Sequence, residues 1–105
     1  MQLLTGIEQD TQQDIEFDQD EALEPNYKVF IHNDDVTPMD SVVAVLQKIF
    51  ELNAPESEHV MLTAHITGVA YVTTLPLTEA QKRVGKAHFA ASLEGYPLTF
   101  TIEPE

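Results

Sequence analysis

The chain has 105 residues, 43% of them hydrophobic, which suits one small globular domain and leaves no room for a second. Its 18 acidic residues against 5 lysines and arginines give a formal net charge of −13. We therefore expect neither nucleic acid nor an anionic membrane surface as a partner, because both need dense cations. Without cysteine the chain has no disulfide, thiolate nucleophile or cysteine metal site. No apolar run is long enough for a membrane span and no secretion signal is recognisable, so we expect a cytoplasmic protein.

Residues 1–25 hold eight acidic residues, no lysine or arginine, and no sustained apolar period. Such a segment cannot bury enough apolar surface to offset its chain entropy, so we predict a disordered acidic tail. The tail either keeps the protein soluble or acts on a partner. Acids at alternate positions from 14 to 20 resemble a calcium loop, but Gln19 and Pro25 stand where that loop needs glycine and glutamate. We therefore predict no metal site and no cofactor.

Residues 26–105 predict a single α+β domain with elements in the order β-α-α-β-α-β. Residues 27–32 (YKVFIH) are rich in β-formers and predict the first strand. Thr37 as a cap and Pro38 in the first turn predict a helix whose apolar residues repeat at helical spacing up to position 50. A second helix is predicted from about Pro55 to Gly68, because glycine commonly follows a helix end.

Residues 69–75 are rich in β-branched side chains and predict the second strand. Thr78 and Gln81 form a predicted capping box that opens a third helix running to about Leu93, with Gly95 beyond it. Residues 98–102 (LTFTI) alternate in polarity and predict the last strand. We expect a three-stranded antiparallel sheet packed with all three helices, because three strands alone make too small a core.

The densest polar cluster outside the tail is the run 32–39 (HNDDVTPM), between the first strand and the first helix. Loops between regular elements often carry function. Asn and Asp are also turn formers that bond their own backbone, so a plain turn is the alternative interpretation. Asp34 and Asp35 could do acid–base work, but neighbours in an extended turn point apart and nothing in the sequence sets them apart as acid and base. No motif pairs a serine or threonine with a base, so covalent catalysis is not predicted.

Several separated motifs, in one order, resemble the ClpS adaptors of the bacterial and plastid N-degron pathway. The resemblance covers residues 27–102. Its motifs are Asn33-Asp34-Asp35 followed by Thr37-Pro38-Met39 after a Tyr-Lys-Val strand start, Val42-Val43-x-Val45-Leu46-Gln47-Lys48, Met61-Leu62 with His65 and Gly68, and Pro97-Leu98. It implies a non-catalytic adaptor that binds the free α-amino group and the large hydrophobic first side chain (Leu, Phe, Tyr or Trp) of a degradation substrate. It further implies delivery to a ClpA/ClpC-type AAA+ unfoldase, docked through the unfoldase's N-terminal domain, by a monomer of the cytoplasm or, in an organellar form, of the plastid stroma.

By the same resemblance, the α-amino group is bound by Asn33, Asp35 and His65, and Asp34 joins them or shapes the turn. An ammonium ion has three donors and needs acceptors with nearby negative charge. An amide oxygen, a carboxylate and a neutral imidazole nitrogen supply them. Considered alone, His65 would be interpreted as an ordinary helix histidine; its register with the Asn-Asp-Asp run favours a ligand contact.

The apolar walls of the expected pocket also follow from the resemblance. The matching positions are Thr37, Pro38, Met39, Val42, Met61, Ala64 and Leu98. Met61 and His65 lie four residues apart and share one helix face, and methionine deforms to fit several large side chains. The alternative is that Met39 and Met61 only fill the core. Val36 stands where the family often has an aromatic residue, so the rim of the site should be less bulky. Ala64 stands where a larger aliphatic is usual, which should widen the floor of the pocket.

Three of the five cations fall in one five-residue stretch of the predicted third helix: Lys82, Arg83 and Lys86. They are a solvated helix face, an unfoldase docking surface as the resemblance implies, or an intramolecular contact such as one that holds the acidic tail. Two other functions stay open. One is a peptide-binding module of the same fold that needs no free N-terminus or regulates the unfoldase without delivery. The other is a hydrolase using His65 with Asp34 or Asp35, for which no spacing supplies a nucleophile or a metal.

Overall fold

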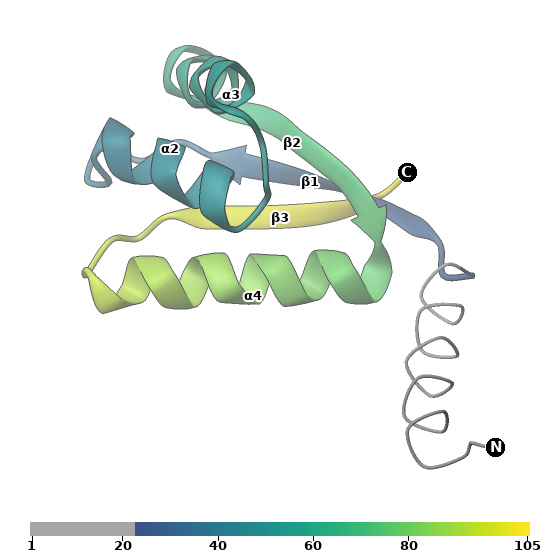
Figure 1. Cartoon of the computed structure of the whole chain (residues 1–105). Helices are drawn as coiled ribbons and strands as arrows, with labels where there is room; N and C mark the ends of the chain where they lie inside the picture. The colour runs from purple at the N-terminus through teal and green to yellow at the C-terminus, as the bar shows by residue number, and fades with distance from the viewer. Residues whose placement is uncertain (1–22) are drawn as a thin grey trace, which may run out of the picture.

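The structure is a computed structural model, and it describes residues 23–105 of the chain. Its elements are β1 (Asn26–His32), α2 (Met39–Lys48), α3 (Ala54–Thr67), β2 (Val69–Pro76), α4 (Leu77–Leu93) and β3 (Thr99–Pro104). The three strands form one antiparallel sheet in the order β2-β1-β3 (Figure 1). The predicted fold class and element order are confirmed. The prediction of a disordered tail falls on residues 1–22, which lie outside the described part, and on the three residues that follow.

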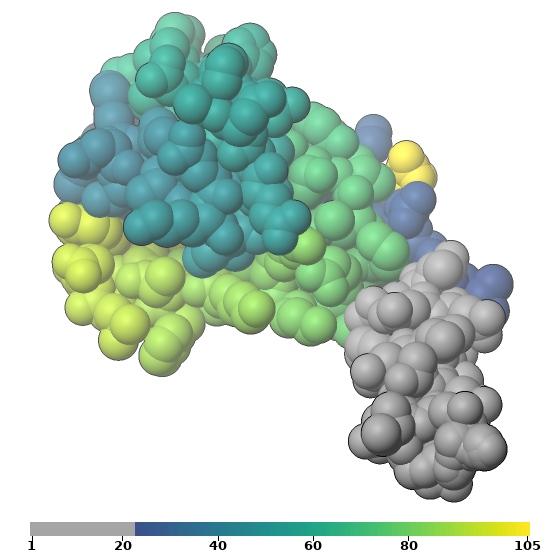
Figure 2. All heavy atoms as spheres, viewed as in Figure 1, coloured from purple at the N-terminus to yellow at the C-terminus, as the bar shows by residue number. Residues whose placement is uncertain are grey.

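One face of the sheet carries the helices and holds the core. The alternation along β1 turns Val29 and Ile31 onto this face, where both are buried. Ala70, Val72 and Phe100 of the outer strands continue it. Helix α4 contacts all three strands, and α3 packs on β2 and α2. In the space-filling view α2 and α3, in blue and teal, form one layer above the green to yellow α4 (Figure 2).

Helix α4 packs on the sheet through small side chains. Its buried residues are Ala80, Ala87 and Ala91, which let the helix approach the strands closely because the interaxial distance depends on the side chains at the contact. No helix in residues 23–105 is long and apolar enough to cross a membrane.

Two helices begin where the sequence predicts, but the predicted caps are wrong. The N-cap residue of α2 is Pro38, without a side-chain bond, and the Thr37 hydroxyl instead donates to Asp34 Oδ2 at 3.0 Å. The N-cap residue of α4 is Pro76, and the box of Thr78 with Gln81 does not form. Both threonines act as donors because a carboxylate stands within reach of the hydroxyl and of the N–H group of the same residue.

The carboxylate that replaces the predicted box at α4 is Glu24. Its Oε1 accepts a hydrogen bond from Thr78 N at 2.8 Å, and its Oε2 accepts one from the Thr78 hydroxyl at 2.7 Å. Pro25 O accepts a further bond from Leu77 N at 3.1 Å. Glu24 and Pro25, which we assigned to the tail, therefore contact the folded core, at the N-terminus of α4 where a negative charge is favoured.

Candidate functional site

The loop after β1 is tied to the end of α3. Asn33 N donates to Gly68 O at 2.9 Å, and Gly68 N donates back to Ala64 O at 2.8 Å. Gly68 has a φ of 96°, in the left-handed region that favours glycine at a helix end. The last turn of α3, which carries His65, is thereby held beside the Asn-Asp-Asp run, although about thirty positions separate them in the sequence.

Asp34 organises the turn that leads into α2. Its Oδ1 accepts hydrogen bonds from Val36 N at 2.8 Å and Thr37 N at 2.7 Å, in addition to the Thr37 hydroxyl bond on Oδ2. Partial burial raises the pKa of Asp34, but these hydrogen bonds from Thr37 and Val36 outweigh it, and the net pKa lies below its ordinary value. Asp34 is therefore ionised at neutral pH, with both oxygens engaged inside the turn. Asp35, the next residue, is exposed.

A pocket of about 290 Å³ lies between this turn, the start of α2 and the last turns of α3. It is lined by all the residues predicted for the α-amino group and for the apolar walls: Asn33, Asp34, Asp35, Thr37, Pro38, Met39, Val42, Met61, Ala64, His65 and Leu98. The structure thus brings together side chains from the loop between β1 and α2, from α2 and α3, and from the segment before β3. Their roles toward a ligand stay predictions.

The pocket is apolar in its depth and polar at its mouth. The buried lining residues include Val42, Ala64 and Leu98, with 9%, 3% and 5% of their surface exposed. The exposed polar lining residues include Asn33, Asp35 and His65. Met39 is 44% exposed and Met61 is half-buried, so the methionines span the two zones. Such a cavity suits a ligand with one apolar end and one polar, hydrogen-bonding end.

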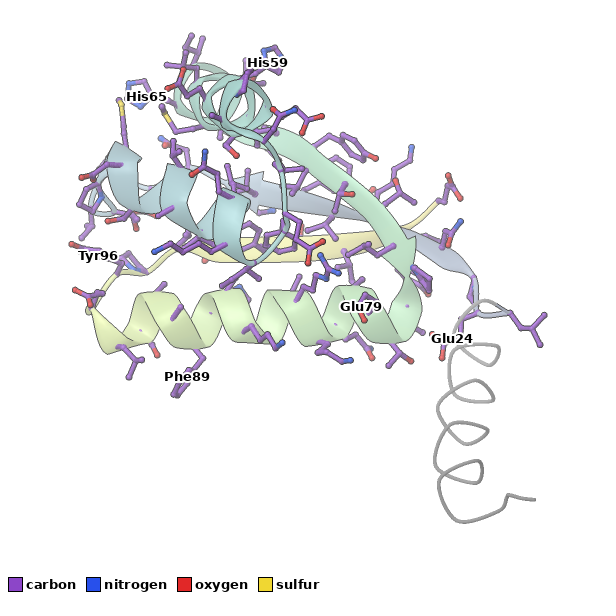
Figure 3. All side chains as sticks on the ribbon, in the orientation of Figure 1. Glu24, His59, His65, Glu79, Phe89 and Tyr96 are labelled. Carbon is purple, nitrogen blue, oxygen red and sulfur yellow. The ribbon has the colours of Figure 1, made fainter. Side chains whose placement is uncertain are left out.

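The local sequence of α3 sets which side chains reach the pocket. The helix opens on a capping box in which Asn53 and Glu56 bond each other's backbone N–H groups at 2.8 and 3.0 Å. Val60 and Ala64 are buried in the core. Met61 and His65, one position further along in each case, come round to the pocket, and His65 lies at the end of α3 near the start of α2 (Figure 3). The predicted common face of Met61 and His65 is present.

Three further residues line the pocket: Ile31, His32 and Val36. Sequence reasoning placed Val36 at the rim and missed the other two as lining residues. The signal was the end of the first strand, since the last residues of a strand that leads into a predicted site contribute to that site. Ile31 is 1% exposed and also belongs to the core, while the His32 ring bonds Thr101 Oγ1 at 2.8 Å.

The three cations of α4 do not line the pocket, and they are not equivalent. Arg83 turns inward: its Nε donates to Glu79 Oε2 at 2.6 Å and one terminal nitrogen donates to Ile49 O at 3.3 Å, which joins α4 to the end of α2. The hydrogen bond from Arg83 holds the pKa of Glu79 below its ordinary value. Lys82 and Lys86 are exposed. Arg83 therefore has a role within the fold, whatever it does toward a partner.

Within residues 23–105, no group of three or more histidine, aspartate or glutamate side chains is placed to hold a metal ion.

The pocket and the fold together define a small α+β domain of the ligand-binding class. A family model described as ATP-dependent Clp protease adaptor protein ClpS matches residues 22–101. The chain belongs to the ClpS family.

Individual relatives agree with this assignment. The Clp protease adapter protein ClpS of Desulfatibacillum aliphaticivorans is 38% identical over 79 residues, which cover 75% of this chain and 76% of that protein. ClpS 2 of Mesorhizobium japonicum is 42% identical over 79 residues, which cover 75% and 78%. The solved structure of Agrobacterium tumefaciens ClpS2 bound to L-phenylalaninamide matches with a TM-score of 0.74 and 37% identity, over 77% of this chain and 98% of that one.

Proposed function

We propose that the pocket binds the first residue of a degradation substrate, with the first side chain in the apolar depth and the α-ammonium at the polar mouth. The observation that carries this proposal is the division of the lining into buried apolar and exposed polar zones. A free N-terminal residue with a large hydrophobic side chain has the same division. An internal residue has no free α-ammonium, because its backbone nitrogen is part of a peptide bond.

The acceptors for the ammonium are the Asn33 amide oxygen, the Asp35 carboxylate and a ring nitrogen of neutral His65. All three residues are exposed at the mouth, where the terminal amino group of a bound chain would lie. Asp34 contributes mainly through the turn that it holds, because both of its oxygens already accept hydrogen bonds.

The apolar depth selects large side chains such as Leu, Phe, Tyr and Trp. A volume of about 290 Å³ is at the small end of ligand pockets, which suits a single side chain. Burial of one such side chain supplies about 1.5–3 kcal/mol, so the ammonium contact must add the selectivity for a free terminus. The small Ala64 widens the floor, and we expect Trp-initiated peptides to bind about as well as Leu-initiated ones.

The solved relative supports the same ligand class. The Agrobacterium ClpS2 structure holds L-phenylalaninamide, which has a free α-amino group and one large apolar side chain. A relative that is 37% identical and matches over 98% of its length gives a close template for the same site in this chain.

Delivery is the second half of the proposed function. In this proposal the protein acts as an adaptor and not as an enzyme. It docks on the N-terminal domain of a ClpA/ClpC-type unfoldase through α4, with Lys82 and Lys86 exposed for contact and Arg83 supporting the helix. The tail of residues 1–25 promotes transfer of the substrate to the unfoldase. The protein acts as a cytoplasmic monomer.

The test of binding is a calorimetric titration with a Phe-initiated peptide, in free and in N-acetylated form. We expect binding of the free peptide and a loss of at least tenfold on acetylation, which removes the ammonium. An Asp35→Asn variant should lose affinity for the free peptide only, and a Glu103→Gln variant, with the same change in net charge at the far end of β3, should not. Equal affinity for both peptides would overturn N-terminal recognition and favour the peptide-binding module.

The test of delivery compares the full chain with a variant that lacks residues 1–22. Peptide affinity should be unchanged, while degradation of an N-degron substrate by the reconstituted unfoldase and peptidase should slow. Equal degradation rates would overturn the role of the tail without affecting the binding proposal.

A further inference from the structure

Helix α4 has a long exposed face opposite to its buried alanines. Four residues spaced four, three and four apart form this face, which we name the α4 outer stripe: Lys82, Lys86, Phe89 and Leu93. Phe89 is 65% exposed and Leu93 is 69% exposed, one helical turn apart. Phe89 points away from the sheet (Figure 3). Neither Phe89 nor Leu93 lines the pocket proposed to bind the first residue of a substrate, so the proposed function does not account for them.

The stripe is basic in an otherwise acidic domain. Residues 26–105 hold ten acidic residues and five cations, and the stripe carries two of the five. Lys82 lies 3.6 Å from Glu79, whereas Lys86 forms no ion pair with the described residues. A partner that covers the stripe therefore needs carboxylates near its first half and large apolar side chains near its second half.

The chain itself contains such a segment. Residues 14–20 (DIEFDQD) place Ile15 and Phe17 among four carboxylates. The rest of the domain has a net negative charge and therefore repels this acidic segment. Among residues 26–105, the two stripe lysines and their neighbour Arg83 are the one concentration of cations.

The attachment of Glu24 to Thr78 makes the contact geometrically direct. Thr78 lies four residues before Lys82 on the same face of α4, so the tail leaves the fold at the first end of the stripe. From Thr78 to Phe89 the helix rises about 17 Å. The seven residues from Glu24 back to Phe17 span up to about 23 Å when extended. Phe17 can therefore reach Phe89, and Ile15 can reach Leu93.

We propose that residues 14–20 bind the α4 outer stripe of the same molecule, with Phe17 against Phe89 and Leu93 and the carboxylates beside Lys82 and Lys86. Attachment at Glu24 makes the contact intramolecular, with an effective concentration on the order of millimolar. The contact does not depend on N-terminal-residue binding. Where the proposed docking of the unfoldase also uses Lys82 and Lys86, the unfoldase displaces the tail from α4, which frees it for transfer of the substrate.

The experiment uses the absence of cysteine, which allows a single nitroxide label at Gln13→Cys in the full chain. The label should broaden the amide resonances of residues 86–93 in NMR spectra and leave those of α3 sharp. The broadening should be the same at different protein concentrations and should weaken at high salt, because ionic screening acts on exposed charges. Uniformly weak broadening over all surfaces would overturn the proposal.

Two pairs of variants of the labelled chain test the residues. Lys86→Glu should remove most of the broadening, whereas Lys48→Glu, with the same change in net charge on the exposed end of α2, should keep it. Phe89→Ser should remove it, whereas Ile66→Ser, at an α3 residue that is 77% exposed, should keep it. A pattern that both stripe variants leave unchanged would overturn the proposal.

A second copy of the chain is the competing occupant of the stripe. To test it, unlabelled ¹⁵N chain is mixed with nitroxide-labelled ¹⁴N chain. Broadening of α4 resonances in this mixture would show contact between molecules and overturn the intramolecular assignment. Sharp resonances in the mixture, with broadening in the singly labelled ¹⁵N chain, would support it.

Discussion

Helices α2 and α4 begin at opposite ends of the sheet (Figure 1), and a threonine near each start makes the same contact with a carboxylate. Thr37 donates its N–H and its hydroxyl to Asp34 at 2.7 and 3.0 Å. Thr78 donates the same two groups to Glu24 at 2.8 and 2.7 Å. The hydrogen bonds lower the pKa of both carboxyl groups. The chemistry of the two contacts is the same, and the difference lies in what each contact joins.

Asp34 and Thr37 are three residues apart, whereas Glu24 and Thr78 are 54 apart. The first contact closes a single turn and shapes the mouth of the pocket. The second joins the end of the tail to the start of α4, and it closes a long loop, whose entropy cost is met only when the sheet has assembled. The same kind of threonine–carboxylate contact thus shapes the binding site at one end of the sheet and fixes where the tail leaves the fold at the other end.

Asp34→Ala should have the largest effect, because it removes three hydrogen bonds from the turn at the pocket. We expect the free energy of unfolding to fall by about 1 kcal/mol, as for loss of a side-chain cap. Affinity for a Phe-initiated peptide should fall at least about tenfold, which corresponds to 1.4 kcal/mol. Urea denaturation and calorimetric titration measure the two quantities.

The control for this variant is Glu103→Ala, which removes one charge from β3 at the far end of the sheet. It should leave peptide affinity within a factor of two. If Asp34→Ala bound the peptide as well as the original chain, the turn would not be what positions Asn33 and Asp35.

Glu24→Ala tests the other contact and should have a smaller effect. It removes the two acceptors of Thr78, so we expect a lower melting temperature, while peptide affinity stays unchanged because Glu24 does not line the pocket. A nitroxide at Gln13→Cys should also broaden α4 resonances less in this variant, because the tail is no longer attached beside the stripe. A loss of peptide affinity would mean that the two ends of the sheet are coupled.

The comparison also shows how far the sequence predicts the fold. All six elements follow from apolar spacing, proline and glycine positions, and β-branched runs, because those signals act within a few residues. The cap predicted at Thr78 was wrong for the opposite reason. A capping box is a rule about residues three apart, and the carboxylate that bonds Thr78 lies at position 24. Thr37 does not cap α2, because the Thr37 hydroxyl donates to the charged carboxylate of Asp34 in the preceding turn.

The candidate site divides in a similar way. That Asn33 and Asp34 form a turn could be predicted from residue type. That His65 lies beside them could not, because it depends on the Asn33–Gly68 backbone bond that joins β1 to the end of α3. The resemblance to ClpS supplied that pairing. The resemblance did not indicate Ile31 as a lining residue. Strand alternation did not indicate it either, because alternation predicts that Ile31 points into the core.

The smallest expected effect is the pH dependence of stability, which should differ between the Asp34 contact and the Glu24 contact. A carboxyl group with a lowered pKa stabilises the folded state above its unfolded pKa, and that stability is lost as the pH falls through the folded pKa. The ordinary values are 3.8 for Asp34 and 4.5 for Glu24, and both are lowered in the fold. Asp34→Asn and Glu24→Gln keep an acceptor oxygen but cannot ionise.

Each variant should therefore be less stable than the original chain at pH 7, and the difference should shrink on acidification. The Glu24 difference should begin to shrink at a higher pH than the Asp34 difference, because the ordinary pKa of glutamate is higher. Thermal unfolding of the three chains from pH 7 to pH 3 measures this. A difference that stays constant over that range would mean that hydrogen-bond geometry, and not the negative charge, is what the carboxylate contributes to each contact.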